Sequence, residues 1–230
     1  MKTKVLTFVV FAFIVSITFY KCSQDKKQAG EAAESTAKGS EAVEPETDDR
    51  EIGLKLYGIR SGIIEYKHTG TRTGTSKLYF DRYGHRSATY SDLVMNNQPD
   101  KGWIISFDEM QYMYKEGNKQ GAKMKNPMIE GLAKVNDLEK FVEETYNKMG
   151  FKPSGNEMHL GKECRVFKGE MGKVLTWNGL LMFMEMNVMG TITRQEATRI
   201  DVNVPVKKSV FELPTDVTFS EMNMFGSGGM

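Results

Sequence analysis

Cysteine and histidine are scarce in this chain of 230 residues, which has two cysteines and three histidines. Two cysteines cannot build a disulfide-rich scaffold or a four-cysteine zinc site. His68, His85 and His159 have no partner at a metal-ligand spacing, so we expect them at solvent-facing positions. The motifs of common hydrolases and of phosphate-binding loops are also missing from the sequence. We therefore expect no enzyme, no metal and no cofactor.

An excess of charge of one sign is also missing. Lysine and arginine total 31 and aspartate and glutamate total 30, which gives a formal net charge of +1. This balance gives no general electrostatic case for nucleic-acid binding. Hydrophobic residues make up 40% and charged residues 27% of the chain, which is enough apolar material for the packed core of one ordinary domain.

The N-terminus predicts a membrane tether. Lys2 and Lys4 precede an apolar run over residues 5–20, which is shorter than the ~20 residues of a comfortable bilayer span, and Cys22 follows. We predict a leader over residues 1–22 with Cys22 as the site of lipid attachment. Lys21 stands where lipoprotein signals carry a small residue. An uncleaved apolar anchor and a released protein therefore stay open.

Composition divides the rest of the chain. Residues 23–50 hold eight acids against four bases and almost no large aliphatic side chains, which predicts an acidic, disordered tether. Residues 51–218 hold the apolar patterning of a folded domain. Residues 219–230 end in a glycine-rich stretch and are predicted to form a flexible tail.

Short apolar-alternating runs separated by turn residues fill the folded region and predict nine or ten β-strands. Asn178-Gly179 is the strongest hairpin signal, because both residue types tolerate positive φ. A last long strand is expected over residues 192–204.

Two helices are expected within this β pattern. Asn136 followed by Glu139 predicts a capping box for a helix that runs to Met149 and ends at Gly150. Its apolar stripe comprises Leu138, Phe141, Val142, Thr145 and Met149. A shorter helical turn is expected over residues 128–134, after a proline.

The predicted fold class is mainly β (α+β). So many antiparallel strands with so little helix must curl, and we predict an incomplete antiparallel β-barrel, that is, a strongly curved single sheet. One long and one short helix would cover its concave side. A two-sheet sandwich is the alternative.

Turns and strand starts also carry a resemblance to a known family, in the segments Gly62–Tyr66, Lys77–Gly84, Lys123–Met128, Gly161–Cys164, Trp177–Leu180 and Phe211–Pro214. They resemble segments of bacterial envelope proteins related to the lipoprotein carriers and receptors of the Lol type (LolA/LolB-like). The resemblance spans residues 55–218 and implies an open β-barrel with helices as its lid, around a cavity that accepts acyl chains. It also implies a place in the cell envelope, facing the periplasm. No functional residue of the carriers matches a position here.

A methionine row is the most unusual stretch of the sequence. Met182, Met184 and Met186 alternate along one predicted strand, and unbranched, polarizable thioethers can repack around ligands of different shape. Trp103, Ile105 and Phe107 alternate along another strand. We expect these six residues to line the cavity. Ordinary core packing stays open for the methionines, and copper binding through thioethers is a third reading.

Other reactive side chains suggest only structural roles. Cys164 lies in a strand-like run and is expected to be a buried, inert thiol. Glu139, Glu143 and Glu144 are expected on the solvated face of the long helix.

Two functions follow as hypotheses. The first is a membrane-tethered envelope protein that holds a lipid, or the acyl chain of a lipoprotein, in a hydrophobic cavity. The second is a structural or interaction lipoprotein with a filled core and no small-molecule ligand.

Overall fold

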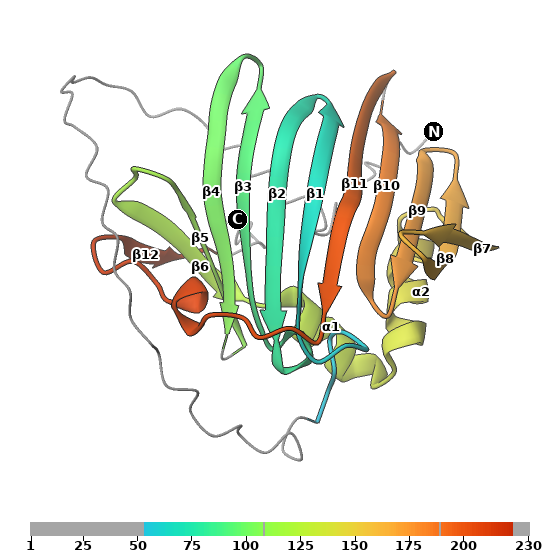
Figure 1. Cartoon of the computed structure of the whole chain (residues 1–230), viewed down its shortest axis with the longest axis horizontal. Coiled ribbons are helices and arrows are strands. Elements are labelled where there is room, and N and C mark those ends of the chain that lie inside the picture. Colours follow the sequence, from blue (N-terminus) through green and yellow to red (C-terminus); the bar gives the residue numbers. More distant parts are fainter. Residues whose placement is uncertain (1–52, 108, 189, 223–230) are drawn as a thin grey trace, which may run out of the picture. The chain divides into compact units, whose positions relative to one another are not determined.

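The structure is a computed structural model that describes residues 53–107, 109–188 and 190–222. The predicted leader, the tether and Cys22 lie outside these residues. The described part is built around a single twelve-stranded sheet with two α-helices (Figure 1). In chain order the elements are β1 (Gly62–Gly70), β2 (Arg72–Asp81), β3 (Arg86–Met95), β4 (Gln98–Phe107), β5 (Met110–Lys115), β6 (Gln120–Lys125), α1 (Pro127–Val135), α2 (Leu138–Lys148), β7 (Lys152–His159), β8 (Lys162–Gly169), β9 (Gly172–Trp177), β10 (Leu180–Val188), β11 (Thr191–Val202) and β12 (Thr218–Glu221). Two short 3₁₀ helices, η2 (Arg82–Gly84) and η3 (Lys208–Phe211), complete the set.

Two antiparallel meanders make the sheet. Strands β1 to β6 pair in sequence, strands β7 to β11 pair in sequence, and β11 returns to pair with β1 at the centre. The order across the sheet is β12-β6-β5-β4-β3-β2-β1-β11-β10-β9-β8-β7. One sheet with two free ends confirms the predicted curved open sheet, so the sandwich alternative is wrong. The strand count was predicted too low, since twelve strands form.

The strand β12 corrects the predicted C-terminal boundary. Residues 219–221 were expected in a flexible tail, yet Thr218–Glu221 pairs in parallel with β6 over Gln120–Lys123. The sheet is therefore mixed at this edge. Residues 223–230 lie outside the described residues.

Hairpin chemistry explains several of the tight connections. Asn178 and Gly179 both have positive φ, 50° and 77°, as the predicted two-residue turn requires. Asn96 and Asn97, with φ of 52° and 61°, make a similar connection between β3 and β4. Asparagine accepts this backbone region better than other side chains, so both turns fit the twist of their strands.

The sheet curls most strongly at its β7 end. The Nε2 atom of His159, the last residue of β7, lies 2.8 Å from the carbonyl oxygen of Ala197 in β11. Four strand spacings separate β7 from β11, which would be roughly 19 Å in a flat sheet. A direct hydrogen bond across that interval is possible only because the β7–β10 end rolls back toward β11.

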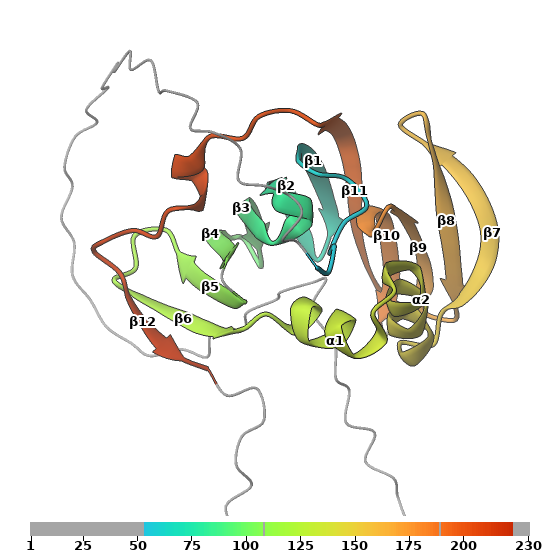
Figure 2. The same ribbon diagram turned by 90° about the horizontal axis from the view of Figure 1, so that it is seen from below.

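The helices connect the two far ends of the sheet, from β6 to β7, and lie beneath its arch (Figure 2). Helix α1 begins at Asn126, whose Oδ1 accepts a hydrogen bond from the Met128 amide, and ends at Asn136 in the left-handed region. Asn136 was predicted to open the long helix, and this is wrong. Asp137 caps α2 by accepting from the Lys140 amide.

The end of α2 matches its prediction. The amide of Gly150 donates to Asn147 and that of Phe151 to Tyr146, which is the Schellman pattern, and the Phe151 ring lies 6.2 Å from that of Tyr146. The buried side chains of the helix are Phe141, Val142 and Tyr146. Tyr146 was not in the predicted stripe.

Candidate functional site

The face of the sheet that meets the helices can be traced strand by strand. One row of paired residues runs through Leu93, Gly74, His68, Gln195, Met184, Val174 and Phe167. The ring of Phe167 lies 4.9 Å from the ring of Tyr146 in α2. The row therefore belongs to the side of the sheet that α2 covers, which we call the helix-side face.

Met184 and Met186 lie on the helix-side face and are 2% and 6% exposed. Met182 does not continue the row regularly, because the register of β10 against β9 shifts between Leu181 and Phe183. This irregularity adds one residue to β10 and changes its alternation. Met182 is fully buried in a core cluster that also holds Tyr66.

Trp103, Ile105 and Phe107 lie on the opposite face of the sheet. Across the ladders, Trp103 of β4 stands opposite Tyr90 of β3, Tyr90 opposite Lys77 of β2, and Lys77 opposite Glu65 of β1. These four residues therefore lie on one face. Lys67, two residues after Glu65, lies on the same face of β1, and the ladders continue this face through Glu196 of β11 to Phe183 of β10. Met184, the next residue of β10, therefore lies on the opposite face. The six residues predicted to line one cavity therefore divide into two sets, because the pairing register across the six strands from β4 to β10 places them on opposite faces.

A segment between β11 and β12 covers the second set. Phe211 is buried with Ala88 and Ile105. Side chains packed against this cluster include Trp103, Phe107, Val206, Val210 and Leu213. We call residues 203–217 the strap, and the surface beneath it the strap-side face. Figure 2 shows the strap above the arch, with both helices below it.

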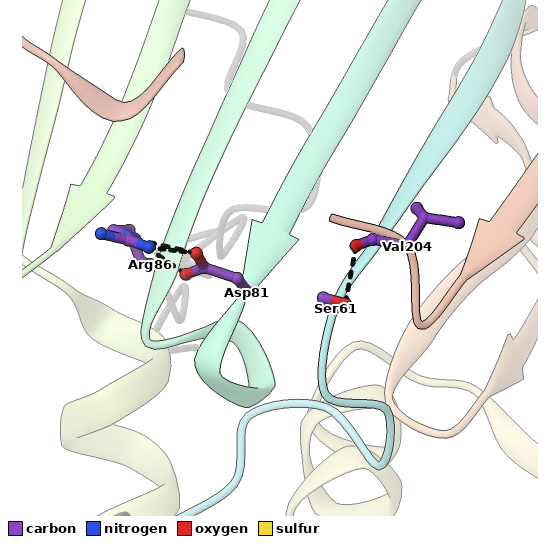
Figure 3. A network of polar contacts seen from close by, with 4 residues as sticks. All are labelled: Ser61, Asp81, Arg86 and Val204. Atoms are coloured by element: carbon purple, nitrogen blue, oxygen red, sulfur yellow. Dashed lines mark hydrogen bonds and ion pairs between the residues drawn. The ribbon is translucent and has the colours of Figure 1, made fainter. Parts of the chain in front are cut away.

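A polar contact fixes the start of the strap (Figure 3). The Ser61 hydroxyl donates to the Val204 carbonyl over 2.8 Å. The Arg86 guanidinium donates from Nε to Asp81 Oδ1 over 2.8 Å, as Figure 3 also shows. The same guanidinium lies over the Phe211 ring in the middle of the strap, 4.8 Å from the ring centroid. Sequence reasoning missed this element because two prolines and two lysines make the segment resemble a loop. The closely spaced Val206, Val210, Phe211 and Leu213 were the available signal.

The helix-side face is not wholly apolar. His68 Nε2 lies 2.8 Å from Ser76 Oγ, and the Tyr66 hydroxyl donates to the Leu181 carbonyl over 2.9 Å. Burial, together with the charge of Arg72, lowers the pKa of His68 to about 4. Burial also raises the pKa of Tyr66 well above its usual range. Both side chains are thus neutral near pH 7.

Arg72 lies on the same face at only 9% exposure. It stands two residues from Gly74 and pairs across the β2–β3 ladder with Met95. No carboxylate of the described residues forms an ion pair with it. Asp100, which the ladders also place on the helix-side face, is paired with Lys115 over 2.8 Å. Arg72 is thus a largely covered side chain whose head group still reaches solvent and is not matched by a described carboxylate.

The remaining predicted residues have structural partners. Cys164 is fully buried, as predicted, and burial raises its pKa. The three histidines were expected to face solvent, and this is wrong. His68 and His159 are half-buried and bonded as described above, and half-buried His85 is within hydrogen-bonding distance of the Leu54 carbonyl through Nε2. Glu143 pairs with Arg165 over 2.7 Å and so joins α2 to β8.

Two kinds of feature are missing from residues 53–107, 109–188 and 190–222. No three histidine, cysteine, aspartate or glutamate side chains gather there as a metal site. No helix there has the length and hydropathy needed to cross a bilayer.

Known proteins offer only distant likenesses. No protein-family model and no curated protein matches the sequence. Among solved structures, an uncharacterized conserved protein from Thermus thermophilus is 4% identical with a TM-score of 0.49, covering 72% of this chain and 92% of that one. LprF from Mycobacterium bovis is 9% identical with a TM-score of 0.34, covering 66% and 89%. MucA/MucB of Pseudomonas aeruginosa is 9% identical with a TM-score of 0.39, covering 69% of this chain and 57% of that one. These likenesses carry no argument about what this chain binds.

Proposed function

We propose that this protein is a membrane-tethered binding protein of the bacterial envelope that holds the acyl chain of a lipid or lipoprotein against the helix-side face. The observation that carries this proposal is the set of apolar side chains on the helix-side face. Met184, Met186, Val174 and Phe167 lie together on one face of an open, curved sheet. An acyl chain would lie between this surface and the helices.

The chemistry of the surface suits such a ligand. Each methylene removed from water contributes ~0.8 kcal/mol, so a long chain supplies most of its own affinity. Methionine side chains have three rotatable bonds and can move aside without leaving a rigid gap. A surface built from methionine therefore accommodates chains of different length.

A substitution at Met184 tests the proposal. The full chain, extracted gently and measured by native mass spectrometry, should carry co-purified lipid. Met184→Trp should remove that lipid, because the larger ring occupies the space of the chain. Met158→Trp is the matched control, since Met158 is 64% exposed on β7. A parent protein without lipid, and without binding of a fatty-acid probe, contradicts the proposal.

The second candidate, a structural or interaction protein with a filled core, is supported by a different observation. Val166 and Phe167 in β8, and Val174 and Leu175 in β9, are consecutive residues that are all buried. Both faces of these strands are therefore covered by protein. At the free edge, residues 152–158 of β7 are all exposed, which leaves a strand edge open to a partner. A lipid-free mass for the parent favours this candidate.

The membrane tether has its own test. If Cys22 is acylated, Cys22→Ala should abolish metabolic labelling with a palmitate analogue and move the protein out of the detergent fraction. An unlabelled parent with unchanged fractionation would assign anchoring to the apolar run of residues 5–20 instead.

A further inference from the structure

Arg72 has a position that the acyl-binding proposal does not use. It is 9% exposed, it lies on the helix-side face, and its side chain forms no hydrogen bond or ion pair with another described residue. The guanidinium nitrogens are not among the fully buried, unbonded polar atoms of the described residues, so the charged head keeps contact with water while the rest of the side chain is covered. Such a head can bind an anion without first breaking an ion pair with a described carboxylate.

The surroundings of Arg72 narrow the chemistry of that anion. Its cross-strand neighbour is Met95, and Leu93, which is 5% exposed, pairs with Gly74 in the next row. His68, whose pKa the charge of Arg72 helps to lower, is hydrogen-bonded to Ser76 and neutral near pH 7. Arg72 is thus a cation beside apolar side chains, without a carboxylate partner among the described residues. That setting disfavours a small hydrated anion and favours one that carries its own apolar group.

The distance between Arg72 and the methionines of β10 also fits an anion that carries an apolar chain. From β2 to β10 there are three strand spacings, through β1 and β11, or roughly 14 Å along the sheet. Gly70, opposite Thr193 in β11, presents no side chain in the interval. An extended acyl chain spans this interval.

We propose that Arg72 is the anchor for the anionic head of an acyl ligand, a carboxylate or a phosphate, whose chain lies toward Met184 and Met186. The inference rests on the proposed acyl-binding function and adds the class of head group to it. Guanidinium forms two parallel hydrogen bonds with either oxyanion, so both heads fit the same side chain. Arg72 here acts in binding and takes part in no reaction.

Binding of paired probes to the full chain tests the assignment. Palmitate and hexadecyl phosphate carry an anionic head, and hexadecanol has the same chain with a neutral head. The parent should bind at least one anionic probe about tenfold or more tightly than hexadecanol, as a charge-assisted bond allows. Which of the two binds more tightly distinguishes a carboxylate from a phosphate head.

Three variants complete the experiment. Arg72→Gln should bring the anionic probes down to the affinity of hexadecanol, and Arg72→Lys should keep part of the difference. Arg199→Gln is the matched control, since Arg199 pairs with Asp201 and stands on the strap-side face. The control should bind as the parent does. Circular dichroism of each variant shows whether its fold is kept. If Arg72→Gln unfolds, the comparison of anionic and neutral probes is made with Arg72→Lys.

The outcomes separate the two proposals. Equal binding of palmitate, hexadecyl phosphate and hexadecanol by the parent, or unchanged binding by Arg72→Gln, overturns the head-group assignment and leaves acyl binding intact. Failure of all three probes overturns both. Binding of inorganic phosphate as tight as that of hexadecyl phosphate also overturns the assignment, because the chain would then contribute nothing.

Discussion

The two faces of the sheet are covered by different means. The strap-side face is closed by a segment whose aromatic and branched side chains interlock with Ile105 and Ala88, and Ser61 and Arg86 fix that segment from the sheet. The helix-side face is covered by two helices and carries unbranched methionines, a neutral histidine and an arginine that no described carboxylate pairs with. The first arrangement favours a single rigid packing, and the second leaves room for exchange of contacts.

The sharpest test of this difference is to weaken the strap. Phe211→Ala should lower the free energy of unfolding by about 3–5 kcal/mol, because Phe211 is 4% exposed and packs on a close-fitting surface. Urea denaturation measures the loss. Probe binding on the helix-side face should stay the same per folded molecule. A loss below about 1 kcal/mol would mean that the strap is not part of the rigid core.

A pH titration of stability tests the neutral histidine. The pKa of His68 is about 4 in the folded chain and ~6.5 when unfolded, so between these values the unfolded state binds the extra proton. This contribution to stability is complete above pH 6.5 and is lost as the pH falls toward 4. The slope reaches at most ~1.4 kcal/mol per pH unit. His68→Gln should flatten the profile in this window, and equal slopes in parent and variant would contradict the expected burial.

Tyr66→Phe tests the irregular part of β10. The Tyr66 hydroxyl is the donor to the Leu181 carbonyl, next to the register shift, and its loss leaves that buried carbonyl without this donor. We expect a loss of about 1–2 kcal/mol in urea denaturation. Tyr112→Phe on the strap-side face is the comparison and should change stability less. A neutral Tyr66→Phe would show that the bulge is held by packing alone.

The smallest effect is expected at the contact between α2 and β8. Glu143→Gln removes an ion pair with Arg165 in which the two side chains are 41% and 35% exposed. Such pairs contribute at most about 1 kcal/mol. Thermal unfolding should move little, and that shift should shrink further in high salt. A large shift would mean that this contact, more than the Tyr146–Phe167 stacking, positions the helix.

Local signals predicted the parts of the fold that depend on local chemistry. The Asn178-Gly179 turn, the Gly150-Phe151 helix end and the short helix after Pro127 follow from residues close together in sequence, and the structure confirms them. Asn136 was predicted to begin α2, but it ends α1. Asparagine suits both the start of a helix and the left-handed residue at the end of one, so its type does not distinguish the two positions.

The placement of six residues on one face was wrong, because it depends on pairing at longer range, and a cavity lined by either set stays a prediction. Alternation within a strand identifies which residues share a face, but the relation between β4 and β10 depends on every ladder between them. The bulge between Glu65 and Tyr66 in the β1–β11 ladder changes that relation, and a second bulge near Met182 disturbs the alternation of β10 itself. Neither bulge has a local sequence signature strong enough to be read from one chain. Arg72 was missed because an arginine at the start of a strand usually faces water.

The pairing of β1 with β11 has a consequence for folding kinetics. Ser61 and Val204 are separated by 143 positions, so the middle of the sheet depends on contacts among the most distant in the domain. Contacts of this kind slow folding, because loop closure must be achieved before they contribute. During synthesis β1 keeps one unpaired edge until residue 202 has emerged. A nascent chain with that edge open is exposed to mispairing with neighbouring chains, so a chaperone that delays collapse should raise the yield of native protein.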